Sequence, residues 1–126
     1  MLENIFTEKA PAAIGPYSQA IKVQETLYTS GQIPVDPTVG KVTATEIQGQ
    51  TEQVMKNLKA VLEEGGASLQ SVIKTTCFLT DMTNFAAFNE VYGTYFGDHK
   101  PARSCVAVKE LPLGVLVEVE AIAITK

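Results

Sequence analysis

Apolar residues recur at spacings of three and four over residues 46–64, which is the pattern of a helix that buries one face. That face carries Ile47, Thr51, Val54, Leu58, Val61 and Leu62. The pattern predicts a helix from Glu46 to Glu64, with the side chain of Thr43 or Thr45 as its N-terminal cap. Gly65 and Gly66 come next and should end it.

A second helix is expected over residues 83–96, opened by Asp81 or Thr83 and stopped by Gly97. Its buried stripe would consist of Phe85, Phe88, Tyr92 and Phe96. Asn89 lies among these apolar residues, and it is either a buried polar contact or an ordinary surface residue.

Runs rich in β-branched, aromatic and other apolar residues predict strands between these helices and beside them. They are residues 72–79, 103–108 and 116–125, with shorter extended pieces at 18–23 and 26–30. Asp36-Pro37 and Gly40 mark a loop that leads to the first helix. Residues 111–114 (LPLG) form a turn-bearing connection between the last two strands.

The order of strands, helix, strand, helix and strands predicts an α+β fold, a mixed β-sheet with two helices on one face. With no internal repeat and no linker, residues 1–126 are expected to form one domain. The run from Ala121 to Ile124 is apolar at both odd and even positions, so both faces of that strand require burial. In so small a domain, another copy of the chain is the natural cover.

Composition and charge argue against several classes of function. Hydrophobic residues make up 45% of the chain, which is enough for a core. The net charge is −4 and the ten Lys and Arg residues are scattered, with Lys56 and Lys59 nearest to a cluster, so nucleic acid is an unlikely partner. Two cysteines and one histidine are too few for the usual zinc site. No run suits a membrane span or a signal peptide, and we expect a cytoplasmic protein.

Arg103 is the only arginine in the chain, and it stands at the start of a predicted strand. A guanidinium can hold a carboxylate through two parallel hydrogen bonds, which an ammonium cannot do. Glu118 and Glu120 are two residues apart and therefore share one sheet face. Either Arg103 forms a structural salt bridge with one of them, or it holds a substrate carboxylate while one glutamate handles a proton or a water.

Other polar positions give weaker signals. Cys105 shares the strand face of Arg103 but has no evident base, since nothing places His99 beside it, so a small buried thiol is the simpler interpretation. Cys77 is interpreted in the same way. The glycine-bearing turns at residues 15–18 and 29–32 could bring backbone N–H groups close to a ligand.

Several ordered motifs then point to a known family. They are residues 12–20 (AAIGPYSQA), 28–34 (YTSGQIP), 74–76 (KTT), 101–105 (PARSC) and 117–123 (VEVEAIA). Over its whole length the chain resembles the RidA (YjgF, endoribonuclease L-PSP) family of reactive-intermediate deaminases. The resemblance implies a chorismate-mutase-like fold and a homotrimer with ligand clefts between subunits.

The resemblance also implies an activity, that of a 2-iminobutanoate/2-iminopropanoate deaminase. Such an enzyme hydrolyses 2-aminoacrylate and related imino acids to 2-oxo acids and ammonia, without a metal or organic cofactor. Carried over by position, the resemblance implies that Arg103 holds the substrate carboxylate and that Glu118 orients the attacking water. Glu118 is preferred to Glu120 for this role on the position of the motif alone. The cleft would be lined by Tyr17, Ser30, Gly31, Asn89, Cys105 and Pro112.

Two other functions fit a chain of this kind. One is a ribonuclease or translation inhibitor, which the acidic charge and the single histidine disfavour. The other is a small-carboxylate-binding or chaperone-like module without turnover, which would use Arg103 in the same way.

Overall fold

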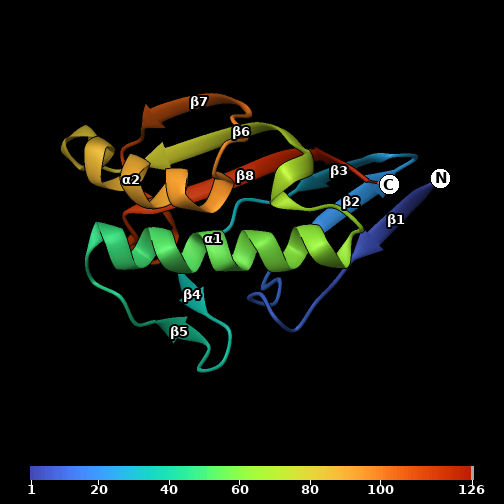
Figure 1. Ribbon diagram of the computed structural model, residues 1–126. Coiled ribbons are helices and arrows are strands. Elements are labelled where there is room, and N and C mark those ends of the chain that lie inside the picture. The colour runs from blue at the N-terminus through green and yellow to red at the C-terminus, as the bar shows by residue number, and fades with distance from the viewer. Residues whose placement is uncertain (126) are drawn as a thin grey trace.

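The computed structural model describes residues 1–125 and contains a six-stranded sheet (Figure 1). Its strands are β1 (Leu2–Ile5), β2 (Ala20–Val23), β3 (Thr26–Thr29), β6 (Val72–Leu79), β7 (Ala102–Ala107) and β8 (Val117–Ile124). They lie in the order β1-β2-β3-β8-β6-β7. Strands β6 and β7 are parallel, whereas the other neighbours are antiparallel. The sheet is therefore mixed, as predicted.

Both long helices, α1 (Ile47–Glu64) and α2 (Phe85–Phe96), pack against the same side of this sheet (Figure 1). The core lies between the two layers, because an apolar helix face and an apolar sheet face must bury one another. Among its fully buried residues are Leu27, Val54, Leu58, Leu62, Val72, Cys77, Phe88, Val117 and Val119. The predicted α+β class with two helices on one face is confirmed.

Helix α1 ends where the sequence indicates but begins without the predicted cap. Gly66 follows it with a φ of +87°, a conformation that favours glycine. At the other end Glu46 is the N-cap and makes no side-chain capping bond, so the prediction of Thr43 or Thr45 was wrong. The side chain of Gln50 instead turns back and donates a 3.0 Å hydrogen bond to the carbonyl of Ala44.

Helix α2 is preceded by a 3₁₀ turn, η2 (Met82–Asn84), so it begins two residues later than predicted. The carboxylate of Asp81 accepts hydrogen bonds from the backbone N–H and the hydroxyl of Thr83, at 2.9 and 2.8 Å. Phe88, Tyr92 and Phe96 are buried in the expected stripe, whereas Phe85 is only half-buried. Gly97 stops the helix with a φ of +63°.

The N-terminal third contains more regular structure than predicted. The edge strand β1 was not anticipated, because its four residues show no clear alternation. The expected loop at residues 36–40 is the turn of a small hairpin formed by β4 (Val35–Asp36) and β5 (Lys41–Val42). Gly40 at the end of that turn has a φ of +74°, which explains the glycine there.

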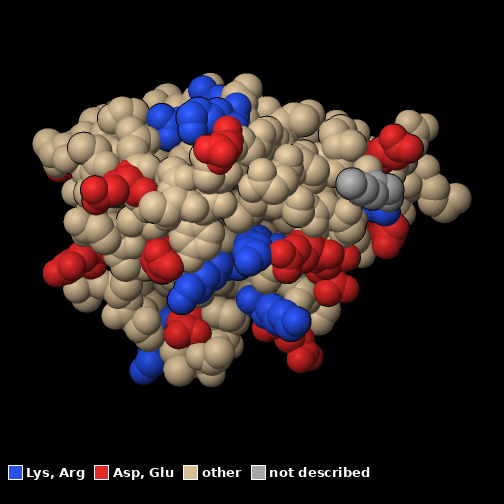
Figure 2. Space-filling model, in the orientation of Figure 1, with Lys and Arg blue, Asp and Glu red and all other residues tan. Residues whose placement is uncertain are grey.

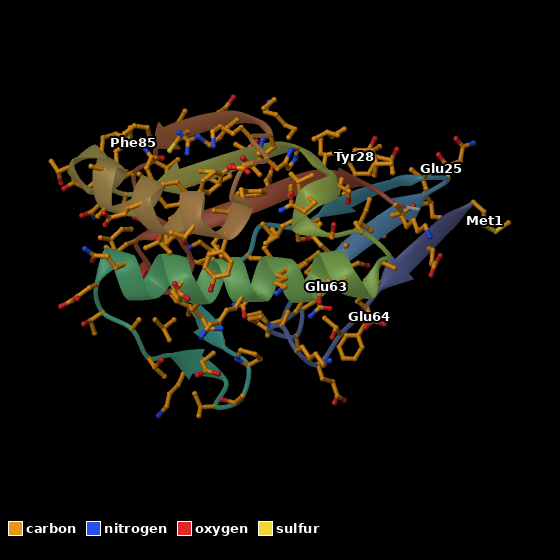
Figure 3. The ribbon with its side chains drawn as sticks, in the orientation of Figure 1. Met1, Glu25, Tyr28, Glu63, Glu64 and Phe85 are labelled. Carbon is orange, nitrogen blue, oxygen red and sulfur yellow. The ribbon has the colours of Figure 1, made fainter. Side chains whose placement is uncertain are left out.

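The side of the sheet opposite the helices is uncovered. Along β8 the residues alternate, so that Val119 and Ala121 face the helices whereas Glu118, Glu120 and Ile122 face the open side. Apolar side chains on or beside that open side include Tyr28, Ile73, Val106 and Ile124, each between 39% and 49% exposed. Tyr28 projects away from α1 (Figure 3). Within residues 1–125 neither helix is both long and apolar enough to cross a membrane.

Candidate functional site

Arg103 projects from the edge strand β7 toward the helix side of the sheet. It lies opposite Thr75 in the parallel pairing of β7 with β6. One guanidinium nitrogen donates a 2.7 Å hydrogen bond to the Oδ1 atom of Asn89 on α2. The side chain remains exposed rather than buried. Its remaining N–H groups are therefore free to hold an anion in the two-pronged manner of a carboxylate.

Two aromatic rings support the same guanidinium. Its central carbon lies 5.0 Å from the ring centroid of Tyr92 and 5.5 Å from that of Phe85, so it is held by cation–π contacts. The Tyr92 hydroxyl is fixed in turn by a 2.7 Å hydrogen bond with Thr75. Phe85 lies near the start of α2 (Figure 3). Neither ring was predicted at the site, although both belong to the apolar stripe read from the sequence.

Cys105 lies two residues beyond Arg103 on the same side of β7, opposite Cys77 of β6. Both thiols are free; Cys77 is buried and Cys105 is half-buried. Burial raises the pKa of Cys105, and the neighbouring Arg103 opposes that shift. Burial raises the pKa of Cys77 to about 12. The neutral thiol therefore prevails at both positions near pH 7, which suits a cleft wall better than a nucleophile.

The second group of predicted residues gathers around Glu118 of β8. Gln32 and Val119 exchange backbone hydrogen bonds of 2.8 and 3.2 Å, which brings the Ser30–Gly31 loop alongside this strand. Gly31 is so close that a Cβ there would lie 1.9 Å from the Oε2 atom of Glu118. Only glycine leaves room for the carboxylate in this position.

The loop that carries Tyr17 and Ser30 is held by hydrogen bonds across two segments. The Ser30 hydroxyl donates to the carbonyl of Ser18 at 2.6 Å, and the Ser30 N–H donates to the carbonyl of Gln19 at 2.9 Å. Buried Gln19 accepts a 2.7 Å bond from the N–H of Thr7 and donates back to its carbonyl at 3.1 Å. The exposed ring of Tyr17 thus stands on a fixed backbone and lines the same hollow as Gly31.

Glu118 and Glu120 share one face, as the sequence requires, but their surroundings differ. Glu118 is half-buried against Gly31, and burial together with the nearby Glu120 raises its pKa. Glu120 lines a separate hollow of about 120 Å³ with Tyr28 and Lys74. A carboxyl with a raised pKa beside a glycine loop is the better candidate for proton transfer.

Arg103 and Glu118 lie on opposite faces of the sheet within one chain. Thr75 and Cys77, opposite Arg103 and Cys105, are buried under the helices. Glu118 pairs with Phe78, whose side chain points to the open face. Within one chain, the alternative of a salt bridge between Arg103 and Glu118 or Glu120 of β8 is therefore wrong, because the sheet separates them.

Pro112 opens another 3₁₀ turn, η3 (Pro112–Gly114), in which Leu113 has a left-handed φ of +59°. Leu113 is exposed and forms part of the wall of a hollow of about 570 Å³. Tyr17 and Gly31 line the same hollow. This hollow therefore adjoins the group around Glu118.

On the face seen in Figure 2, the charged residues do not form a surface of one sign. Basic and acidic side chains are interspersed there, and Lys56 and Lys59 share a groove with Glu63 and Glu64. No cluster of three or more His, Cys, Asp or Glu residues that could hold a metal occurs within residues 1–125. The imidazole of His99 is engaged with the carbonyl of Val72 at 2.6 Å, away from Cys105.

Comparison with known proteins places these features in context. Residues 7–125 match the family model described as Endoribonuclease L-PSP. A RutC family protein of Pyrococcus abyssi is 56% identical over 96% of this chain and 95% of its own length. The 2-iminobutanoate/2-iminopropanoate deaminase of Salmonella typhimurium is 45% identical over the full length of both chains. The crystal structure of Escherichia coli TdcF with bound serine superposes with a TM-score of 0.94 at 43% identity, over 98% of this chain and 99% of that one.

Proposed function

This chain belongs to the endoribonuclease L-PSP (RidA) family, and on that premise we propose that it hydrolyses reactive 2-imino and enamino acids to 2-oxo acids and ammonia. The substrates would include 2-iminopropanoate and 2-iminobutanoate, with 2-aminoacrylate entering as its imine tautomer. The observation that carries the proposal is the pair of half-sites, an exposed Arg103 oriented by Asn89 and a half-buried Glu118 set against Gly31.

Two copies of the chain would complete one cleft. Because Arg103 and Glu118 lie on opposite faces of their own sheet, one substrate can reach both only if a neighbouring subunit supplies one of them. The open face bears apolar side chains that such a neighbour would cover. We therefore propose a homotrimer with its sites between subunits, an arrangement in which each subunit contributes both halves to different clefts.

In the proposed reaction Arg103 binds the substrate carboxylate and thereby fixes the neighbouring imine carbon. Glu118 accepts a proton from water as the water oxygen bonds to that carbon, and the C=N electron pair moves to nitrogen, which is protonated. The resulting carbinolamine loses ammonia as the C–N bond breaks and the carbonyl forms, with Glu118 relaying the protons. The imine is already activated, so the chain's own groups suffice for this sequence.

A coupled assay tests the proposal. Threonine dehydratase releases 2-iminobutanoate, which semicarbazide traps faster than it traps the 2-oxo acid. Addition of this protein should lower the initial rate of semicarbazone formation and accelerate ammonia release. The Arg103→Ala variant serves as the inactive control. If the wild type diverts no imine while it still binds 2-oxobutanoate, the chain is a binding module and the proposal is wrong.

The family's description names an endoribonuclease activity, but the distribution of charge on the protein surface supports that activity less well. RNA binding relies on gathered positive charge and exposed stacking rings, whereas Lys56 and Lys59 here share their groove with two glutamates. RNA degradation that persists in a chelator and is lost in Arg103→Ala would favour that activity instead.

A further inference from the structure

The hollow of about 570 Å³ is larger than a small imino acid requires. Pockets that enclose whole drug-sized ligands start at roughly 300 Å³. Its walls come from the N-terminal segment, from the segment that follows β3, and from Leu113. Gly31 lines this hollow together with Tyr17 and also lies against Glu118, so the hollow opens beside the proposed reaction centre.

The walls are mainly apolar, although Thr7, Tyr17, Gln19 and Gln32 also line the hollow. They include Pro11, Ala12, Ile14, Ile33, Val35 and Leu113, and Glu8 is the one charged residue among the lining side chains. The buried side chain of Gln19 is already used by bonds to the backbone of Thr7 and Pro11, the latter at 2.8 Å. Polar groups that are already engaged offer little to a polar ligand, so the hollow favours a hydrocarbon group.

Leu113 adds a second, independent observation. It keeps a φ of +59°, which residues other than glycine and asparagine seldom adopt, and its side chain is 68% exposed. A strained, exposed leucine at the wall of a hollow is unfavourable for the free chain. A bound apolar group that contacts Leu113 would offset this cost by burying its side chain.

We propose that this hollow receives the side chain of the substrate, so that the site prefers 2-imino acids with large apolar side chains over those that carry a methyl or ethyl group. The inference rests on the proposed function. The reacting carbon has three substituents: the carboxylate is assigned to Arg103, the nitrogen leaves as ammonia near Glu118, and the third is the side chain. Gly31 lies against Glu118 and also lines the hollow, so the hollow is the space next to the proposed reaction centre that can take this third substituent.

The test compares imines made in place by a broad-specificity L-amino-acid oxidase with catalase present. Leucine, methionine and phenylalanine provide large side chains, and 2-aminobutyrate provides an ethyl group. Each buried methylene favours the transition state by roughly fourfold, so kcat/KM should rise by about tenfold or more from the ethyl to the large substrates. A flat or inverse dependence in a protein that hydrolyses 2-iminobutanoate would overturn the inference while leaving the proposed function intact.

Two variants act on the hollow in opposite ways. Ala12→Phe places a ring in it, and Leu113→Gly removes one wall at a backbone position that suits glycine. In each variant the ratio of kcat/KM for the leucine-derived imine to that for the ethyl imine should fall toward one. Val39→Phe is the matched control, because it adds the same ring at an exposed residue outside the lining set, and its ratio should equal that of the wild type. An unchanged ratio in both hollow variants would also contradict the inference.

If the protein turns over no imine, the binding of 2-oxo acids tests whether the hollow receives the side chain. Titration calorimetry with 4-methyl-2-oxopentanoate and 2-oxobutanoate compares the same two side chains without chemistry. The larger 2-oxo acid should bind about tenfold more tightly to the wild type and lose that advantage in Ala12→Phe. Equal affinities in the wild type would reject the hollow as a side-chain pocket whether or not the protein is a deaminase.

Discussion

The guanidinium of Arg103 donates a 2.7 Å hydrogen bond to the amide oxygen of Asn89, so a side chain on the exposed edge of the sheet is oriented by the helix beside it. Asn89 is thus a positioning residue under the proposed function. Asn89→Ala should weaken binding of 2-oxobutanoate by about five- to tenfold, in line with the net value of roughly 1 kcal/mol for a hydrogen bond. Asn89→Asp should weaken it further, because the new carboxylate competes for Arg103.

Calorimetry measures both affinities, and Glu90→Ala on the same helix is the control for changes at an exposed neighbour. The free energy of unfolding should change by less than about 0.5 kcal/mol in Glu90→Ala, as is usual for surface positions. Unaltered affinity in Asn89→Ala would show that Arg103 needs no orientation.

Arg103→Ala should yield a folded protein that loses both turnover and ligand binding. Because Arg103 is exposed, its removal leaves no buried charge unpaired and should cost less than about 1 kcal/mol of stability. Thermal melts with 2-oxobutanoate test this: ligand should raise the Tm of the wild type by mass action and leave the variant unmoved. Arg103→Lys should rescue poorly, since a point charge lacks the two-pronged geometry. A ligand-induced Tm rise in Arg103→Ala would mean that the carboxylate binds elsewhere.

Glu118→Gln should abolish most turnover and make the fold less sensitive to pH. A carboxyl whose pKa is raised on folding binds its proton more strongly in the native state. Its contribution to stability is therefore full below the unfolded pKa of about 4.3 and is lost as pH rises through the higher folded pKa. Above that window Glu118→Gln should be more stable than the wild type, and the gain should vanish in acid. Urea unfolding at several pH values measures this difference.

The pH–rate profile offers a second measurement on the same residue. Turnover should increase with pH as Glu118 ionises, because only the carboxylate can accept a proton from water. Glu120→Gln is the matched control, as its side chain lies in a different hollow, and it should retain most activity. Larger loss in Glu120→Gln than in Glu118→Gln would reverse the assignment.

Gly31→Ala should impair turnover far more than stability. The added methyl group would lie 1.9 Å from Glu118 Oε2, so the carboxylate must move away. Since that atom ends a flexible side chain, we expect a stability loss of only about 1–2 kcal/mol but a fall in kcat of at least about a hundredfold. Gly93→Ala on α2, where a Cβ meets nothing within 4 Å, should instead stabilise the fold by roughly 0.5–1 kcal/mol. Equal kcat in Gly31→Ala and the wild type would contradict this account.

Val106→Asp should convert the proposed trimer into a monomer without unfolding it. Val106 is 46% exposed on the open face, where a charge meets water in one chain but would be buried between subunits. Sedimentation should give three times the chain mass for the wild type and one chain mass for the variant, which should also lose turnover. A stable wild-type monomer at micromolar concentration would reject both the trimer and the interfacial cleft.

The local elements were determined by the sequence because they depend on near neighbours. The spacing of apolar residues indicated α1 and α2, and β-branched runs indicated β6 with its bounds at Val72 and Leu79. Gly66 and Gly97 marked both helix ends, since their backbone conformations disfavour other residues. Alternation along β8 likewise placed Glu118 and Glu120 together on one face.

What the sequence left open depended on contacts between distant segments. Spacing alone could not distinguish Glu118 from Glu120, whereas tertiary pairing of Gln32 with Val119 set Gly31 against Glu118. The sequence also could not decide whether Arg103 forms a salt bridge with Glu118 or Glu120. Residues on different strands can be assigned to the same or opposite faces of a sheet only when the strand neighbours are known. The parallel pairing of β7 with β6 put Arg103 on the helix side and beyond reach of Glu118. The alternation of a strand determines which residues share a face. Only the assembled sheet determines whether that face lies against the helices or on the open side.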